Sequence, residues 1–258
     1  MRPSTASSAL PGCSWARFSA ALEATADPRT PTPSALLRVA ERRTLDAPQR
    51  PHGRLAGTLF RTLDLVYGPA STLSKFVVLE LVARVPYQAW ENVGYVAISH
   101  TSTSPRLARR IFDYVRESRA QQDNEQWHLL ILQELVGQPQ GLRGWFLYRA
   151  FPQLLAFFYY HLSWLLYVLV PRWSYELNAD FEDHAQRAYM RYVHDHAEVD
   201  AWAWDSAFAG DYGAYASVGD VLRRIALDER IHRDESLARI AEARFHEDGG
   251  ESSAMLPT

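Results

Sequence analysis

Two short Glu-x-x-His motifs constrain this chain more than any other feature. They are Glu125-Gln126-Trp127-His128 and Glu229-Arg230-Ile231-His232. Residues three apart on a helix lie on neighbouring turns of one face, so each motif can direct a carboxylate and an imidazole toward one point. Two such pairs, with one further glutamate from each of two other helices, form the ligand set of di-iron or di-manganese four-helix bundles. Because one motif alone is common on solvated helix faces, the prediction depends on two more suitably placed glutamates.

Two other predicted helices supply these glutamates. Glu80 lies in a helix predicted over residues 71–100, which Pro86 should bend, and Glu182 lies in a helix predicted over residues 171–201. Successive glutamates of the set are separated by 45, 57 and 47 residues. A helix of about thirty residues is about 45 Å long, so an antiparallel bundle can bring all four glutamates to one depth. The predicted metal ligands are therefore Glu80, Glu125, His128, Glu182, Glu229 and His232.

One alternative to Glu80 is Glu91, which follows it by eleven residues on the same helix face. Asp183 and His184 flank Glu182, and we interpret them as outer or surface groups rather than ligands. Carboxylates and imidazoles together suit iron or manganese, and carboxylates that bridge two ions can hold them close together. The site is therefore expected to bind two ions of iron or manganese per chain.

Strand alternation is absent from residues 53–245, and turn signals are widely spaced, which predicts helices throughout. The expected helices cover residues 55–67, 71–100, 105–136, 145–170, 171–201 and 218–245. We expect an all-α fold: a ferritin-like antiparallel four-helix bundle with a di-iron centre and additional membrane-interfacial helices. Residues 1–52, rich in Ser, Thr, Ala, Pro and Arg, are expected to be a disordered or targeting segment. Residues 53–245 would form the helical domain, and residues 246–258 a disordered tail.

Residues 145–170 are the most apolar part of the chain and contain one charged residue, Arg149. At 26 residues, this segment is long enough to span a bilayer. However, Arg149, Gln153, Tyr160, Ser163 and Tyr167 follow helical spacing and form one narrow polar face. A single span here would also place the two Glu-x-x-His motifs on opposite sides of the bilayer. We therefore expect the segment to lie in the membrane surface without crossing it.

The bulk composition excludes several classes of protein. A net charge of −3 and a pI near 6.3 give no support for nucleic-acid binding. The single cysteine, Cys13, excludes an intrachain disulfide, a zinc–cysteine cluster and a Cys-x-x-Cys redox pair. The oligomeric state is left open, with a homodimer among the alternatives.

Five stretches between residues 55 and 240 resemble the alternative oxidase family, in the order in which the family has them. They cover residues 79–87, 124–130, 171–175, 181–185 and 228–232. Within them, Ala83-Arg84-Val85-Pro86-Tyr87 and Glu182-Asp183-His184-Ala185 are most similar to the plastid terminal oxidase branch. The resemblance implies a membrane-bound, non-haem di-iron quinol oxidase that oxidises quinol and reduces dioxygen to water without pumping protons. Its partners would be ubiquinol or plastoquinol, dioxygen and the lipid surface.

The resemblance also implies roles for individual residues. Tyr189, seven residues after Glu182 on the same face, matches the redox-active tyrosine of the family, while Asn124 and Asp228 match groups that orient the ligating histidines. The quinol pocket would include Lys75, Leu79 and Ala185. Lys75 departs from the family, which often has an arginine there, so the quinol contact would lack a guanidinium fork. The family is peripheral and monotopic on one leaflet, which leaves a bacterial inner membrane and an organelle membrane (thylakoid or mitochondrial inner) as alternatives.

Two other di-iron carboxylate functions remain open from the residues alone. One is a hydroxylase acting on a quinone precursor, and the other is a ferritin-like iron-binding protein. The second would have no need of the apolar face at residues 145–170. A membrane scaffold without metal would leave four inward-facing glutamates unexplained.

Overall fold

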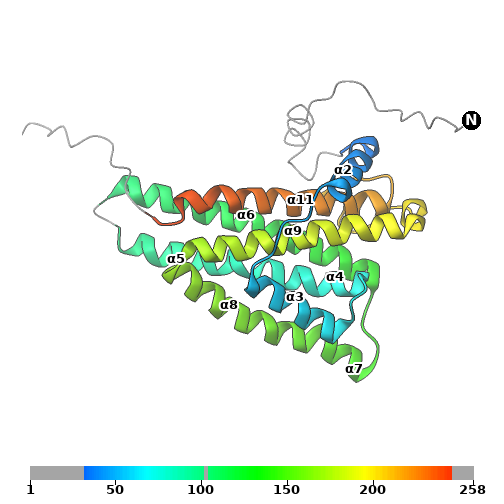
Figure 1. Ribbon diagram of the computed structural model, residues 1–258, viewed down its shortest axis with the longest axis horizontal. Coiled ribbons are helices and arrows are strands. Elements are labelled where there is room, and N and C mark those ends of the chain that lie inside the picture. Colours follow the sequence, from blue (N-terminus) through cyan, green and yellow to red (C-terminus); the bar gives the residue numbers. More distant parts are fainter. Residues whose placement is uncertain (1–31, 102–103, 246–258) are drawn as a thin grey trace, which may run out of the picture.

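The computed structural model describes residues 32–101 and 104–245, and this part of the chain consists of helices and connecting segments without any strand (Figure 1). The predicted all-α fold is confirmed. Most of the N-terminal segment with Cys13, and the predicted tail at residues 246–258, lie outside the described residues.

Four helical columns form the bundle that carries the candidate site. They are α4 (Leu73–Ala83) continued by α5 (Val85–Ser99), then α6 (Pro105–Val136), α9 (Pro171–Asp195) and α11 (Val218–Arg239). Figure 1 shows α4–α5 running antiparallel to α6, and α9 running antiparallel to α11. The bundle is thus built from two antiparallel pairs, and each pair contains one of the two Glu-x-x-His motifs.

The column that carries Glu80 is interrupted at Arg84, between α4 and α5. Pro86 lies in the first turn of α5, where its missing amide hydrogen costs nothing because the first amides of a helix have no intrahelical partner. The predicted bend is therefore realised as two consecutive helices. At the start of α6, Ser104 caps the helix by accepting a hydrogen bond from the amide of Leu107, as expected for the Ser-Pro pair.

Shorter helices surround the bundle and connect its columns. They are α2 (Ser34–Asp46), α3 (Arg54–Tyr67), α7 (Gly141–Trp145), the π-helix η1 (Phe146–Ala150), α8 (Phe151–Leu169), the 3-10 helix η2 (Ala197–Ala201), α10 (Ala209–Tyr212) and the 3-10 helix η3 (Ile240–Glu242).

Helix α2 corrects the predicted boundary at residue 53, because it lies inside the segment expected to be disordered or targeting. It packs against α9 and α11 and buries Leu37 completely. Arg223 of α11, itself 2% exposed, donates to Glu41 of α2 at 2.6 Å, and Ser34 donates to Asp220 at 2.5 Å. The composition of residues 1–52 did not predict this helix, because the helix is stabilised by contacts with distant parts of the chain.

The apolar segment at residues 145–170 is divided among the end of α7, η1 and α8, which lies along one side of the bundle (Figure 1). Ser163 and Tyr167 of the predicted polar face are buried toward the bundle, whereas Gln153 is exposed, against expectation. The opposite face of α8 leaves large apolar side chains uncovered, including Phe157 at 56% and Phe158 at 62% exposure. Among the described residues, no helix combines the length and apolarity needed to cross a membrane.

Close packing of α5 on α6 yields a stability prediction. A Cβ added at Gly94 would lie 2.5 Å from Cγ2 of Val115, a stiff β-branched side chain. Gly94→Ala should therefore lower the free energy of unfolding by about 1–3 kcal/mol, despite the better helix propensity of alanine. In the control Gly57→Ala, the nearest neighbour of the added Cβ is 3.8 Å away, so that variant should gain about 0.5–1 kcal/mol. Denaturant unfolding measures both, and a Gly94 variant as stable as the Gly57 variant would contradict the packing.

Candidate metal centre

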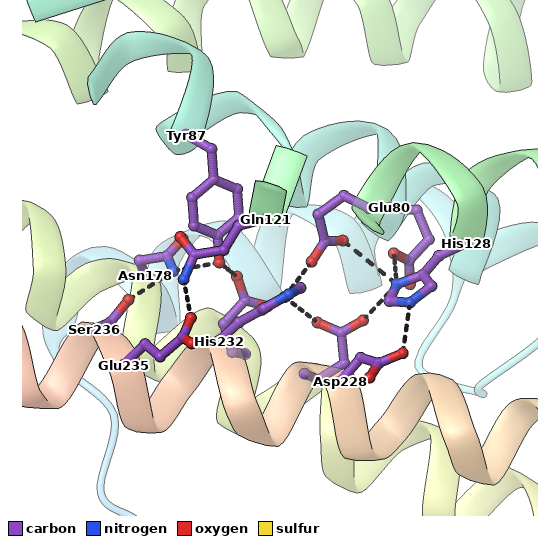
Figure 2. A network of polar contacts seen from close by, with 12 residues as sticks. Glu80, Tyr87, Gln121, His128, Asn178, Asp228, His232, Glu235 and Ser236 are labelled. Atoms are coloured by element: carbon purple, nitrogen blue, oxygen red, sulfur yellow. Dashed lines mark hydrogen bonds and ion pairs between the residues drawn. The ribbon is translucent and has the colours of Figure 1, made fainter. Parts of the chain in front are cut away.

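The six predicted ligands come from four helices and converge in the middle of the bundle (Figure 2). Glu80, Glu125, His128 and Glu229 form one group, and Glu125, Glu182, Glu229 and His232 form a second. Within each group, one candidate ligand atom per residue lies within 4.8 Å of all the others. Glu125 and Glu229 belong to both groups, as bridging carboxylates would. All six side chains are buried, with exposures between 0% and 4%.

The inward-facing atoms of this cluster have no hydrogen-bond partner among the described residues. Although Nδ1 of His232 lies 2.7 Å from Oε1 of Glu125, and Nδ1 of His128 lies 3.0 Å from Oε1 of Glu229, neither contact has hydrogen-bond geometry. Buried polar atoms without partners are rare in native proteins because each costs free energy. A pair of cations would satisfy all of them, so the residues fit a di-metal site. The unpartnered atoms are Oε2 of Glu80, both oxygens of Glu125, Nδ1 of His128, Oε2 of Glu182, both oxygens of Glu229 and Nδ1 of His232.

Crowding of carboxylates perturbs their ionisation. Burial, followed by the charges of Glu229 and Glu125, raises the pKa of Glu80 well above its usual range. Burial, with Glu125 and Glu229, raises the pKa of Glu182 in the same way. For Glu125, burial opposes ionisation, but the neighbouring His128 and His232 outweigh it and lower the pKa. Without metal, the cluster therefore holds protons that bound cations would displace.

The outer nitrogen of His128 is held by a network that the sequence predicted only in part. Nε2 lies 3.4 Å from Oδ2 of Asp228, the predicted orienting residue, and 3.3 Å from the hydroxyl of Tyr212. Tyr212 donates to Asp228 at 2.6 Å, and the fully buried Arg224 donates to the other oxygen of Asp228 at 2.6 Å. The side-chain Oδ1 of Asn124 is buried and has no hydrogen-bond partner among the described residues, the two histidines included. Its predicted role therefore has no contact to support it.

Two tyrosines contact the two glutamates that lie outside the Glu-x-x-His motifs. Tyr189 is fully buried and donates to Oε1 of Glu80, on the neighbouring column rather than on its own helix. Burial, and then the charge of Glu80, raise the pKa of Tyr189 well above its usual range, so the phenol is protonated. Tyr87, which the sequence did not single out as a site residue, donates to Oε1 of Glu182 at 2.8 Å.

The residues predicted for the quinol pocket are buried near the cluster. Leu79 and Ala185 are each 2% exposed, next to Glu80 on α4 and one turn after Glu182 on α9. The ammonium of Lys75 donates to Oδ1 of Asp64 at 2.5 Å and to the carbonyl of Gly68 at 2.8 Å. It is therefore bound by a side chain of α3 and by the residue that caps the C-terminal end of α3. Their role in quinol binding remains a prediction.

A cavity of about 240 Å³ lies between α4, the end of α6, and the segment formed by α7 and η1. Ser74, Val77, Gln133 and Tyr148 are among its lining residues, whereas Lys75, Leu79 and Ala185 are not. Tyr148 belongs to the π-helix η1, a distortion often found at functional sites.

The alternatives weighed from the sequence are placed outside the cluster. Glu91 lies on the surface, where it accepts from Arg119 at 2.6 Å, so it does not replace Glu80. Asp183 is buried and lies 3.1 Å from Arg233 and 3.3 Å from His52. His184 stacks on Phe60 with ring centroids 3.9 Å apart, and burial lowers its pKa to about 4. Both flanking residues therefore fasten α9 to its neighbours.

Sequence reasoning missed Tyr87, Tyr212, Arg224 and Asn178. Tyr212 lies in α10, a short helix within a connection that shows no periodicity, so no signal could have identified it. Tyr87 had a signal, because it follows Glu80 by seven residues just as Tyr189 follows Glu182.

A four-helix bundle with two Glu-x-x-His pairs and two further inward glutamates defines the class of di-iron or di-manganese carboxylate proteins. The model of the alternative oxidase family matches residues 52–238, and the chain belongs to this family. The chain is also similar to ubiquinol oxidase 4, chloroplastic/chromoplastic, from Arabidopsis thaliana, with 34% identity over 139 residues. That match covers 54% of this chain and 36% of the relative. The family inferred from the motifs is thus confirmed, near its plastid terminal oxidase branch.

The clustered carboxylates predict that the metal-free protein loses stability as pH rises. The folded-state pKa values of Glu80, Glu182 and Glu229 lie above their ordinary value of 4.5, and those of His128 and His232 are also raised. A raised folded pKa contributes stability below the unfolded pKa, and this stability is lost as pH rises through the folded pKa. Metal-depleted protein should therefore melt at a higher temperature at about pH 5.5 than at about pH 8.

Thermal unfolding in the presence of a chelator measures this slope. Glu80→Gln should flatten it, because an amide does not ionise when the pH is raised. Glu125 and Asp228, whose pKa values are lowered, stay ionised throughout this range and do not affect the comparison. A metal-free wild type that gains stability between these two pH values would contradict the prediction.

Proposed function

We propose that this protein is a membrane-bound quinol oxidase that reduces dioxygen to water at a non-haem di-iron centre, without pumping protons. The observation that carries the proposal is the set of six buried ligands arranged as two groups that share Glu125 and Glu229. The family membership and the similarity to a plant ubiquinol oxidase support it. Two quinols, each giving two electrons and two protons, balance the reduction of one dioxygen to two waters.

The chain's own residues would bind and position the metal. Glu80 with His128 would hold one iron and Glu182 with His232 the other, and Glu125 and Glu229, which belong to both groups, would serve both. Bound iron would supply the electron transfer to dioxygen that side chains alone cannot perform. Asp228 and Tyr212 hold the outer nitrogen of His128, which leaves Nδ1 directed into the site.

Tyr189 is the proposed redox-active residue. Its hydroxyl donates to Oε1 of Glu80, so the phenol lies beside a proposed ligand in a fully buried position. With iron bound as the electron acceptor, the phenol could give its proton to that carboxylate as the ring loses an electron, which would avoid a buried unpaired charge.

The membrane surface is the proposed source of quinol. The uncovered apolar side chains of α7, η1 and α8 form a continuous segment of the chain, which includes Trp145, Phe157 and Phe158. The exposed Arg143 stands near one end of this segment, where it can meet lipid phosphates. Arg172, near the other end, is also exposed and donates to Glu176 at 2.9 Å. This arrangement supports peripheral binding to one leaflet, with the quinol reaching the centre from the lipid.

Oxygen uptake by purified, iron-loaded protein tests the proposed function. Ubiquinol or plastoquinol should drive uptake that resists cyanide, and wild type should hold about two irons per chain. His232→Ala should lose iron and activity, whereas the control His100→Ala, exposed at the C-terminal end of α5, should keep both. Well-folded wild type without iron or manganese would refute the site. Iron loading without quinol oxidation would favour the ferritin-like alternative, and oxygenated product would favour a hydroxylase.

A separate prediction concerns the phenol of Tyr189. Tyr189→Phe keeps the ring against Phe76, whose centroid is 4.2 Å away, and removes only the hydroxyl. The variant should fold, keep its iron and lose most quinol oxidation, a fall of about a hundredfold or more if the proton-coupled step requires the phenol. Turnover near that of wild type, measured as oxygen uptake, would reduce Tyr189 to a packing residue.

Another prediction concerns the apolar face of α8. Replacing Phe157 and Phe158 with serine removes two half-exposed rings, each worth about 1.5–3 kcal/mol on full burial in an apolar phase. Binding to lipid vesicles should therefore weaken by about a hundredfold. The control Phe112→Ser removes a ring of 43% exposure from α6, and should bind vesicles as wild type does. Co-sedimentation with vesicles measures the difference, and equal binding of all variants would exclude this face.

A further inference from the structure

The spacing Glu-x6-Tyr occurs on both columns that supply a single glutamate to the centre. Tyr87 follows Glu80 by seven residues, across the break between α4 and α5, and Tyr189 follows Glu182 by seven residues within α9. Seven helical residues advance about 10.5 Å along the axis. Such a separation favours a bond from each tyrosine to a glutamate that lies at its own level on a neighbouring helix.

The structure contains this crossed arrangement on both sides. Tyr87 donates to Oε1 of Glu182 at 2.8 Å, and Tyr189 donates to Oε1 of Glu80. In each glutamate the other oxygen, Oε2, is buried without a hydrogen-bond partner. Because α4–α5 and α9 run in opposite directions in Figure 1, one geometry repeats at both ends of the centre.

The direction of the Tyr87 bond is fixed by Asn178, which lies one turn before Glu182 on α9. Figure 2 shows Asn178 beside the phenol of Tyr87. The side-chain amide of Asn178 donates to the phenol oxygen of Tyr87 at 2.9 Å and to Oγ of Ser236 at 3.1 Å. Since an amide N–H can only donate, the phenol oxygen accepts from Asn178, and its own proton is left for Glu182. Tyr87 and Asn178 are both fully buried, so water does not compete for these bonds.

We propose that Tyr87, oriented by Asn178, is a positioning residue for the metal centre: it occupies Oε1 of Glu182 and leaves Oε2 to bind metal. The bond from Tyr87 to Glu182 is thus the counterpart of the bond from Tyr189 to Glu80. This inference rests on the proposed di-metal function and assigns the second tyrosine of the site a role in holding metal. Hydrogen bonds to ligating groups orient them and commonly change metal affinity by about 10–100-fold when removed.

Titration of metal-depleted, full-length protein with Co²⁺, followed by visible absorption, tests the proposal. Tyr87→Phe should bind the weaker of two Co²⁺ ions about 10–100-fold less tightly and shift its absorption bands, because Glu182 is free to change its coordination. Tyr192→Phe is the control: it removes the hydroxyl of a buried α9 tyrosine whose ring packs on Phe76 and His196 rather than on a proposed ligand. It should keep the affinity and bands of wild type.

A double-mutant cycle separates positioning from packing. Asn178→Ala alone should weaken Co²⁺ binding in the same direction, but should add little in the Tyr87→Phe background, because Asn178 acts through the phenol. Affinity and bands of Tyr87→Phe equal to those of wild type overturn the proposal. If Tyr87→Phe does not fold, wild-type affinity in Asn178→Ala overturns it instead. Wild type that binds no Co²⁺ or iron would refute the proposed di-metal function itself, a result distinct from either of these.

Discussion

The structure depends on the burial of four carboxylates and two imidazoles at one level of a helical bundle. Charges of one sign in a dry interior are costly, and burial, together with the charges of Glu125 and Glu229, raises the pKa of Glu80 and Glu182 well above the usual range. Two bound cations would compensate this cost, and the unpartnered atoms of Glu125 and Glu229 would then act as ligands. Metal bound at this centre would hold the four columns at a common depth, in addition to their apolar packing.

The two halves of the centre resemble each other near the ligands and differ further out. Each half contributes a Glu-x6-Tyr column and a Glu-x-x-His column, and the tyrosines bond across to the opposite half. The outer nitrogen of His128 meets Asp228 and Tyr212, whereas Nε2 of His232 makes no such contact among the described residues. Equivalent ligands thus lie in different surroundings, which is a basis for unequal behaviour of two bound ions.

Much of this arrangement follows from the sequence because it is local. The Glu-x-x-His pairs and the intervals between glutamates depend on helical period and length, and the break near Pro86 depends on one missing amide hydrogen. The missed elements depend on tertiary contacts. Helix α2 is held by Arg223 and Asp220 from the far end of the chain, and Tyr212 reaches His128 from a connection without periodicity. The bond from the ammonium of Lys75 to Asp64 was likewise not predicted, because no local pattern encodes it.

The burial of Lys75 has a practical consequence for chemical labelling. It is the only lysine among the 27 basic residues of the chain, it is 6% exposed, and its ammonium is bound by Asp64 and by the carbonyl of Gly68. A reagent that modifies ε-amino groups therefore has a single target in this protein, and that target becomes accessible only when the contact between α3 and α4 opens. The rate of modification at this one position would report how often α3 separates from the bundle, without any engineered probe.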